Sequence, residues 1–151
     1  MKFVIQRVTE ASCEVEGNII GTIKNGYLVL IGIADSDTNE IADKMIAKML
    51  NMRIFSDDEG KTNLSLKDVA GSLLLISQFT LYADCRKGNR PSFTKAGKPD
   101  FAKKMYEYII SECRQSTEKV QTGLFGADMK ISLINDGPFT IVLDSDEIIR
   151  K

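Results

Sequence analysis

The sequence predicts a single α/β domain, residues 1–151, in which a mainly antiparallel, curled, barrel-like sheet packs with two helices. Short apolar runs recur along the chain, and clusters of Gly, Asn and Asp separate them, which is typical of strands joined by hairpins. Only two segments repeat apolar residues at the spacing of a helix. The length of 151 residues and the hydrophobic content of 43% suit one domain with a sizeable core.

The first part of the chain alternates strand-like segments with tight turns. Glu16-Gly17-Asn18 and Asn25-Gly26 are turn sequences, because Asn and Gly tolerate the backbone angles that short hairpins need. The segments between them alternate apolar and polar residues or are apolar throughout. We therefore expect strands at residues 2–8, 11–15, 19–23 and 27–33.

Two helices are expected, and each has a recognisable start. Residues 35–38 supply side chains that cap a helix N-terminus. Pro99 suits the first turn of the second helix, which should end near Gln115. The predicted apolar faces comprise Ile41, Met45, Met49 and Met52 in the first helix, and Phe101, Met105, Tyr108 and Ile109 in the second. Elsewhere we expect strands at residues 53–55, 117–125, 129–134 and 139–143, loops at 56–61 and 63–65, and a polar tail at 144–151.

The stretch at residues 73–84, LLLISQFTLYAD, predicts a buried central strand that three polar side chains interrupt. Ser77, Gln78 and Thr80 would cost free energy in such a strand unless they are paired or used. They could hydrogen-bond neighbouring backbone. Alternatively, the strand ends at a cleft and presents hydroxyls and backbone N–H groups there.

A second unusual stretch is NDGPFT at residues 135–140, between two strand-like runs. It has the composition of a hairpin turn. However, Pro138 lacks an N–H, and bonds preceding proline are the only peptide bonds that are cis with any frequency. A cis Gly137-Pro138 bond would point two adjacent carbonyls the same way, as a rigid pair of acceptors.

The composition excludes several classes of site. The chain has no histidine, which rules out Ser-His-Asp and Cys-His catalysis, so any hydrolysis must act on an already activated substrate. Cys13, Cys85 and Cys113 show no CxxC spacing, so we expect free thiols in a reducing, cytoplasmic compartment, with no metal and no cofactor. No apolar run approaches the ~18 residues of a membrane span, and the first residues suit a strand rather than a signal peptide.

A basic segment lies between Cys85 and Pro99. It holds five cations and no acid, so in a chain with a net charge of −1 the remaining residues carry −6. This distribution predicts localised binding of an anion, most naturally phosphates, although a solvated loop is the alternative. The five cations are Arg86, Lys87, Arg90, Lys95 and Lys98.

Six short motifs are spread in order over nearly the whole chain. The most specific are SQFTL at residues 77–81 and NDGPFT at residues 135–140. The others are QRV at 6–8, NLS at 63–65, KGNRPSF at 87–93 and TGLFGADM at 122–129. In sequence and spacing these motifs resemble those of the D-aminoacyl-tRNA deacylase family. Phe139, where a smaller β-branched residue is common, and Gly97 depart from the family pattern.

The resemblance implies a substrate and an assembly. The substrate would be the ester between a D-amino acid, or glycine mischarged on tRNA(Ala), and the 3′-terminal adenosine of tRNA. The assembly would be a homodimer in which Gly137-Pro138 of one subunit enters the site of the other. There an L side chain would collide with the carbonyls, whereas a D side chain would point away.

The resemblance also implies roles for individual residues. Thr80 is the family's proposed nucleophile, but the sequence offers no base to activate it, so we expect it to position substrate or water. The backbone N–H groups of Phe79 and Thr80 would donate to the oxyanion, while Ser77 and Gln78 would shape the site. Phe125 is either a pocket wall or a core aromatic. The five basic residues of the loop would contact the tRNA acceptor end.

Two other functions remain open at this point. A non-catalytic RNA-binding module would explain the basic loop without any acid–base pair, although no RNP-type or KH-type motif is present. A thiol enzyme could use Cys85, because Arg86 and Lys87 beside it would favour the thiolate.

Overall fold

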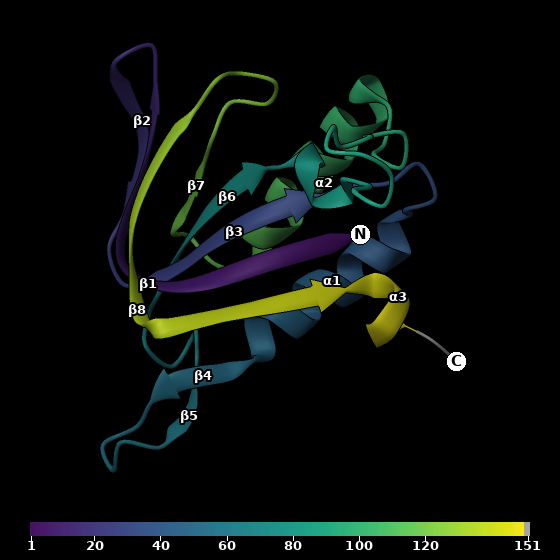
Figure 1. Ribbon diagram of the computed structural model, residues 1–151. Helices are drawn as coiled ribbons and strands as arrows, with labels where there is room; N and C mark the ends of the chain where they lie inside the picture. Colours follow the sequence, from purple (N-terminus) through teal and green to yellow (C-terminus); the bar gives the residue numbers. More distant parts are fainter. Residues whose placement is uncertain (150–151) are drawn as a thin grey trace.

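The computed structural model describes residues 1–149, and its architecture confirms the predicted α/β class. A six-stranded sheet curls into a nearly closed barrel, with strand order β2-β1-β3-β6-β7 and with β8 also paired to β1 (Figure 1). A separate two-stranded sheet, β4-β5, projects below it. The strands are β1 Lys2–Val15, β2 Asn18–Ile23, β3 Gly26–Gly32, β4 Arg53–Ser56, β5 Thr62–Ser65, β6 Ser72–Ser77, β7 Val120–Thr122 and β8 Lys130–Asp144. The helices are α1 Asn39–Asn51, the 3-10 helix η1 Phe79–Tyr82, α2 Pro99–Ser116 and α3 Ser145–Ile148.

The sheet is mixed, in a way that follows from its connections. β1 pairs antiparallel with β2, β3 and β8, whereas β3, β6 and β7 are parallel to one another. Parallel neighbours need long crossovers, and here α1 lies between β3 and β6 while α2 lies between β6 and β7. Both predicted long helices are confirmed, and Thr38 caps α1 by accepting from the N–H of Ile41.

Two pairs of predicted strands are each one continuous strand. The first half of β1 pairs with β3 and its second half with β2. The apolar alternation is therefore interrupted between residues 8 and 11 where the partner strand changes, and the chain makes no turn there. β8 pairs with β1 on both sides of residues 136–139, through Asn135 with Val8 and Thr140 with Gln6, with register shifts between them. The hairpin expected at residues 135–138 is therefore wrong, because this segment bulges out of a continuous strand. The Gly137-Pro138 bond is cis, as considered above.

Other boundaries also differ from expectation. The central strand ends at Ser77 and continues as η1, whereas residues 73–84 were expected to be extended. Residues 63–65, expected as loop, belong to β5, which pairs with β4, and the strand expected at 117–125 shortens to β7. Residues 145–148 form the short helix α3 within the expected polar tail, whose last two residues lie outside the described part of the chain.

β6 is buried on both faces, as its apolar run predicts. Leu73 and Leu75 face α1 and α2 in the larger core, whereas Leu74 and Ile76 face the barrel interior. The alternation follows from the period-2 geometry of a strand, and each such side chain stabilises the fold by ~1.5–3 kcal/mol on burial. The core between the sheet and the helices is formed mainly by Phe3, Ile5, Tyr27, Val29, Ile31, Met45, Met49, Met105 and Ile109.

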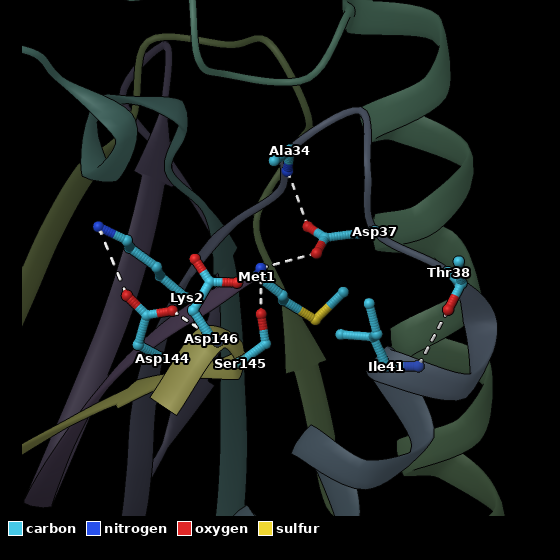
Figure 2. A network of polar contacts seen from close by, with 9 residues as sticks. All are labelled: Met1, Lys2, Ala34, Asp37, Thr38, Ile41, Asp144, Ser145 and Asp146. Carbon is cyan, nitrogen blue, oxygen red and sulfur yellow. Dashed lines mark hydrogen bonds and ion pairs between the residues drawn. The ribbon is translucent and has the colours of Figure 1, made fainter. Parts of the chain in front are cut away.

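The amino group of Met1 is buried in a polar network beside α1 (Figure 2). It donates to Asp37 Oδ1 at 2.7 Å and to Ser145 Oγ at 2.8 Å. Asp37 Oδ2 accepts from the N–H of Ala34 at 2.8 Å. Because Asp37 lies in the segment between β3 and α1, this ion pair fixes that segment against the start of β1 and the start of α3.

Candidate functional site

A cavity of about 720 Å³ lies at the carboxyl ends of the parallel strands β3 and β6. This edge of a parallel sheet is where ligands bind in many open α/β folds. The walls come from β3, β6, η1, the loop before α2, and the loop between β7 and β8. Its lining includes Ile31, Ile33, Ile76, Ser77, Gln78, Phe79, Phe93, Gly97, Lys98, Phe125, Asp128 and Met129.

The end of β6 leaves two backbone N–H groups free, those of Phe79 and Thr80. Phe79 lines the cavity, whereas Thr80, the next residue of η1, is not among the lining residues. The N–H of Gln78 still donates to Ile31 O at 2.8 Å, but the chain then turns into η1. The first N–H groups of such a helix have no intrahelical partner. Within residues 1–149, the N–H groups of Phe79 and Thr80 donate to no acceptor. η1 can lie this close to β3 because residue 32 is glycine: a Cβ there would stand 2.9 Å from the Cβ of Leu81.

The Thr80 hydroxyl is held by an amide and not by a base. Gln78 Nε2 donates to Thr80 Oγ1 at 2.6 Å. An amide does not remove a proton at neutral pH, so this contact orients the hydroxyl without activating it. The one carboxylate of the cavity lining, Asp128, is 87% exposed and paired with Lys130 at 2.9 Å. No base therefore contacts the Thr80 hydroxyl in the described part of the chain, and its positioning role stays a prediction.

Phe125 satisfies both roles that the sequence left open. It lines the cavity and also packs against the larger core, where its ring centroid lies 6.0 Å from that of Tyr106. Tyr106 is fixed by donating its hydroxyl to Leu75 O at 2.7 Å, and burial raises its pKa to about 12. The loop on the opposite wall is fixed by hydrogen bonds from the N–H of Gly97 to Ile33 O and from the N–H of Lys98 to Asp35 Oδ1, both 2.8 Å.

The basic loop is exposed, but one of its cations is already paired. Arg86 Nη2 lies 2.6 Å from Asp84 Oδ2, and this contact holds the pKa of the Asp84 carboxyl well below its usual range. Asp84 lies directly before the basic segment, which begins at Cys85. The other four cations form no ion pair within the described residues, and Lys98 reaches the cavity. These four are Lys87, Arg90, Lys95 and Lys98.

Gly137 and Pro138 are exposed and lie away from the cavity of their own chain. The bulge lies opposite Arg7 of β1. Ser77, at the cavity, pairs with Ile31 of β3, and Ile31 pairs with Phe3 of β1, four residues before Arg7. Four residues along a strand amount to ~13 Å, and the three strand spacings from β8 to β6 add ~14 Å across the sheet. One subunit therefore does not bring the predicted rejection residues to the predicted catalytic residues.

Arg7 supports the bulge, although it is not among the site residues predicted from the sequence. It is 9% exposed, donates from Nε to Asp136 O at 3.0 Å and from Nη1 to Ile54 O at 2.6 Å. Its guanidinium lies 4.6 Å from the ring centroid of Phe139. The sequence contained a usable signal, because Arg7 follows Phe3 and Ile5 on the inward face of β1, where an arginine is out of place without buried partners.

Two classes of feature are not found in the described part of the chain. No cluster of three or more Cys, Asp or Glu side chains there is suited to a metal ion. No helix there combines the length and the apolar character that crossing a membrane requires.

The comparisons with known proteins agree with one another. The sequence model described as D-Tyr-tRNA(Tyr) deacylase matches residues 4–144. A D-aminoacyl-tRNA deacylase of Thermosipho africanus is 52% identical over 148 residues, covering 98% of this chain and 99% of that protein. One from Clostridium perfringens is 53% identical over 145 residues, covering 96% and 97%.

Solved structures share the fold. A c-Myc DNA Unwinding Element Binding Protein has a TM-score of 0.91 at 40% identity, covering 95% of this chain and 98% of its own. A structure described as "a probable eukaryotic D-amino acid tRNA deacylase" has a TM-score of 0.82 at 17% identity, covering 94% and 97%, and so supports the fold alone. The match over residues 4–144 and the identities above half along nearly the full length show that the chain belongs to the D-Tyr-tRNA(Tyr) deacylase family.

Proposed function

We propose that the protein hydrolyses the ester that joins a D-amino acid, or glycine mischarged on tRNA(Ala), to the 3′-terminal adenosine of tRNA. The observation that carries the proposal is the pair of unpartnered N–H groups at Phe79 and Thr80, next to a cavity whose lining carboxylate, Asp128, is exposed and paired with Lys130. Such donors stabilise the oxyanion that forms when an ester carbonyl is attacked, and removing one typically costs ~10²–10³ in rate.

The reaction needs no nucleophilic side chain. A water oxygen adds to the ester carbonyl, the tetrahedral oxyanion accepts hydrogen bonds from the two N–H groups, and the carbon–oxygen bond to the ribose then breaks. The ribose oxygen takes up a proton, and the products are the free amino acid and tRNA. Aminoacyl esters are activated, and the neighbouring ribose hydroxyl can assist the attack. Ser77, Gln78 and Thr80 position the ester and the water.

Rejection of L-amino acids follows from a homodimer. The Gly137 and Pro138 carbonyls of one subunit enter the cavity of its partner, where they meet the side chain of an L-amino acid and accept from the amino group of a D-amino acid. Support for this arrangement comes from the exposure of both residues and from their distance from the cavity of their own chain. Glycine has no side chain to reject, so glycyl-tRNA is a substrate by the same logic.

The acceptor end of tRNA binds along the basic loop. Lys87, Arg90, Lys95 and Lys98 are exposed, and phosphate contacts by such residues supply affinity without reading the base sequence. Arg86 contributes less, because Asp84 already neutralises it.

The test is turnover. D-tyrosyl-tRNA should release free tyrosine in the presence of the purified protein, and L-tyrosyl-tRNA should stay intact. Equal cleavage of the two esters, or cleavage of neither, would refute the proposal.

The alternative is a non-catalytic nucleic-acid-binding module. The exposed cations favour it, as does the similarity to a solved protein named for DNA binding. Binding of tRNA without release of amino acid would establish this alternative. A thiol mechanism through Cys85 has less support, since Cys85 does not line the cavity. Full activity after alkylation of the thiols would remove it.

A further inference from the structure

An exposed aromatic pair stands at the rim of the cavity. Phe79 is 55% exposed and Phe93 is 38% exposed, and their ring centroids lie 5.1 Å apart with an angle of 74° between the planes. Both residues line the cavity. An edge-to-face pair covers only part of each ring, so ring faces remain open to solvent at this rim. Large exposed apolar groups gathered at a cleft are typical of a binding surface.

The backbone that carries Phe93 is fixed before any ligand binds. Asp84 and Ser92 exchange two backbone hydrogen bonds, of 2.7 and 2.9 Å, which close the basic loop immediately before Phe93. The carbonyl of Phe93 then accepts from the N–H of Ala96 at 3.0 Å. Because the backbone at Phe93 is held in advance, a flat ligand that stacks on its ring loses less free energy to ordering of the protein.

The charges around the pair indicate which ligand it suits. Lys87 and Arg90 lie in the closed loop before Phe93, and Lys95 follows two residues after it. Aromatic rings interleaved with cations are the pattern by which proteins bind single-stranded nucleic acid, with bases on the rings and phosphates on the cations. In the proposed substrate, the ester and the 5′-phosphate are at opposite ends of the terminal nucleoside. The N–H groups of Phe79 and Thr80 are the proposed ester site, so we infer that the 5′-phosphate side of the nucleoside faces the loop that carries these cations.

We propose that Phe93, backed by Phe79, is a platform on which an unpaired nucleobase of the tRNA 3′ end stacks, upstream of the terminal adenosine. The inference rests on the proposed function and extends it, because it assigns affinity for tRNA to a ring outside the reacting centre. Lys87, Arg90 and Lys95 bind the phosphates that flank this base.

The kinetic test compares two substrates in the full-length protein. D-tyrosyl-tRNA carries the upstream bases, and D-tyrosyl-adenosine lacks them. In Phe93→Ala, the ratio of kcat/KM for the first to that for the second should fall roughly 5- to 150-fold, the range that one stacked base supplies. The loss should lie in KM for tRNA. Phe93→Tyr and Phe93→Trp should keep the ratio, whereas Phe93→Leu, which keeps an apolar contact with Phe79 but no aromatic face, should not. Ile19→Ala, at a side chain 57% exposed on β2, is the control.

A second readout does not depend on turnover. The chain contains no tryptophan, so Phe93→Trp places a single indole on the platform. Its fluorescence should be quenched by uncharged tRNA and not by tRNA from which the 3′-terminal CCA has been removed. Equal quenching by both RNAs, or an unchanged substrate ratio in Phe93→Ala, would overturn the proposal. A molar mass in solution that is lower for Phe93→Ala than for the unaltered protein would also overturn it, because the ring would then stabilise a dimer. If the unaltered protein cleaves neither ester but the quenching occurs, the proposed function fails while the platform stands.

Discussion

Replacing Arg7 by methionine removes the charged group that contacts and stabilises the Gly137-Pro138 bulge, and it keeps most of the side chain's volume. The guanidinium donates two hydrogen bonds to main-chain oxygens, of Asp136 and Ile54, and lies against the ring of Phe139. Hydrogen bonds from a charged donor contribute ~1.5–3 kcal/mol each, and a desolvated cation–π contact adds ~0.5–2 kcal/mol. Removing a buried charge regains part of its desolvation cost, so we expect the free energy of unfolding to fall by ~2–4 kcal/mol.

The assays are urea denaturation and turnover of D- and L-tyrosyl-tRNA. Besides the loss of stability, the ratio of D to L cleavage should fall roughly 10- to 100-fold, since small misplacements at a reacting site cost rate and selectivity on that scale. Arg114→Met is the matched control: it makes the same substitution at an exposed position in the last turn of α2 and should cost below ~1 kcal/mol. Native stability together with unchanged selectivity in Arg7→Met would refute the reasoning.

Three further substitutions test other parts of the account. Thr80→Ala should lower kcat for D-tyrosyl-tRNA by no more than roughly 10-fold, because its hydroxyl positions the ester or water and contacts an amide rather than a base; a loss of more than ~10³-fold would instead indicate covalent catalysis. Gly137→Ala places a side chain at a φ of +139° and a Cβ 3.1 Å from the N of Phe139. It should lower the free energy of unfolding by ~1–2 kcal/mol and reduce the ratio of D- to L-tyrosyl-tRNA cleavage. An unaltered ratio would show that other residues exclude L-amino acids. Asp37→Ala leaves the buried amino group of Met1 without its anion and should lower the free energy of unfolding by ~3–5 kcal/mol, and a urea midpoint equal to that of the unaltered protein would contradict the role of this pair.

Much of the fold could be predicted because local patterns and tertiary packing agree. The apolar run at Leu73–Ile76 gives a strand buried on both faces, and Thr38 and Pro99 start helices where their chemistry suits the first turn. The errors arise where packing overrides local composition. Asn135-Asp136-Gly137-Pro138 has the residues of a turn, yet Arg7 and pairing with β1 on both sides keep it within one long strand.

The position of the candidate cavity could be predicted in part from the sequence. Ser77, Gln78 and Phe79 line one cavity at the end of the interrupted apolar run, whereas Thr80 does not line it, and their catalytic roles stay predictions. The change from strand to 3-10 helix at Gln78 could not be predicted, because it depends on contact with Gly32 across the sheet. The pairing of Arg86 with Asp84 was missed because the basic segment was counted from Cys85. Arg7 was overlooked because its partners are main-chain oxygens far away in sequence.

The central claim is that main-chain oxygens of one subunit exclude L-amino acids from the cavity of the other subunit and admit D-amino acids. The most direct measurement is the D-to-L cleavage ratio across a dilution series, with molar mass determined by light scattering at each concentration. The account predicts a dimer at concentrations where discrimination is full, and a ratio that declines with the fraction of dimer. A monomeric sample that cleaves D-tyrosyl-tRNA and spares the L form as well as the concentrated protein does would contradict it.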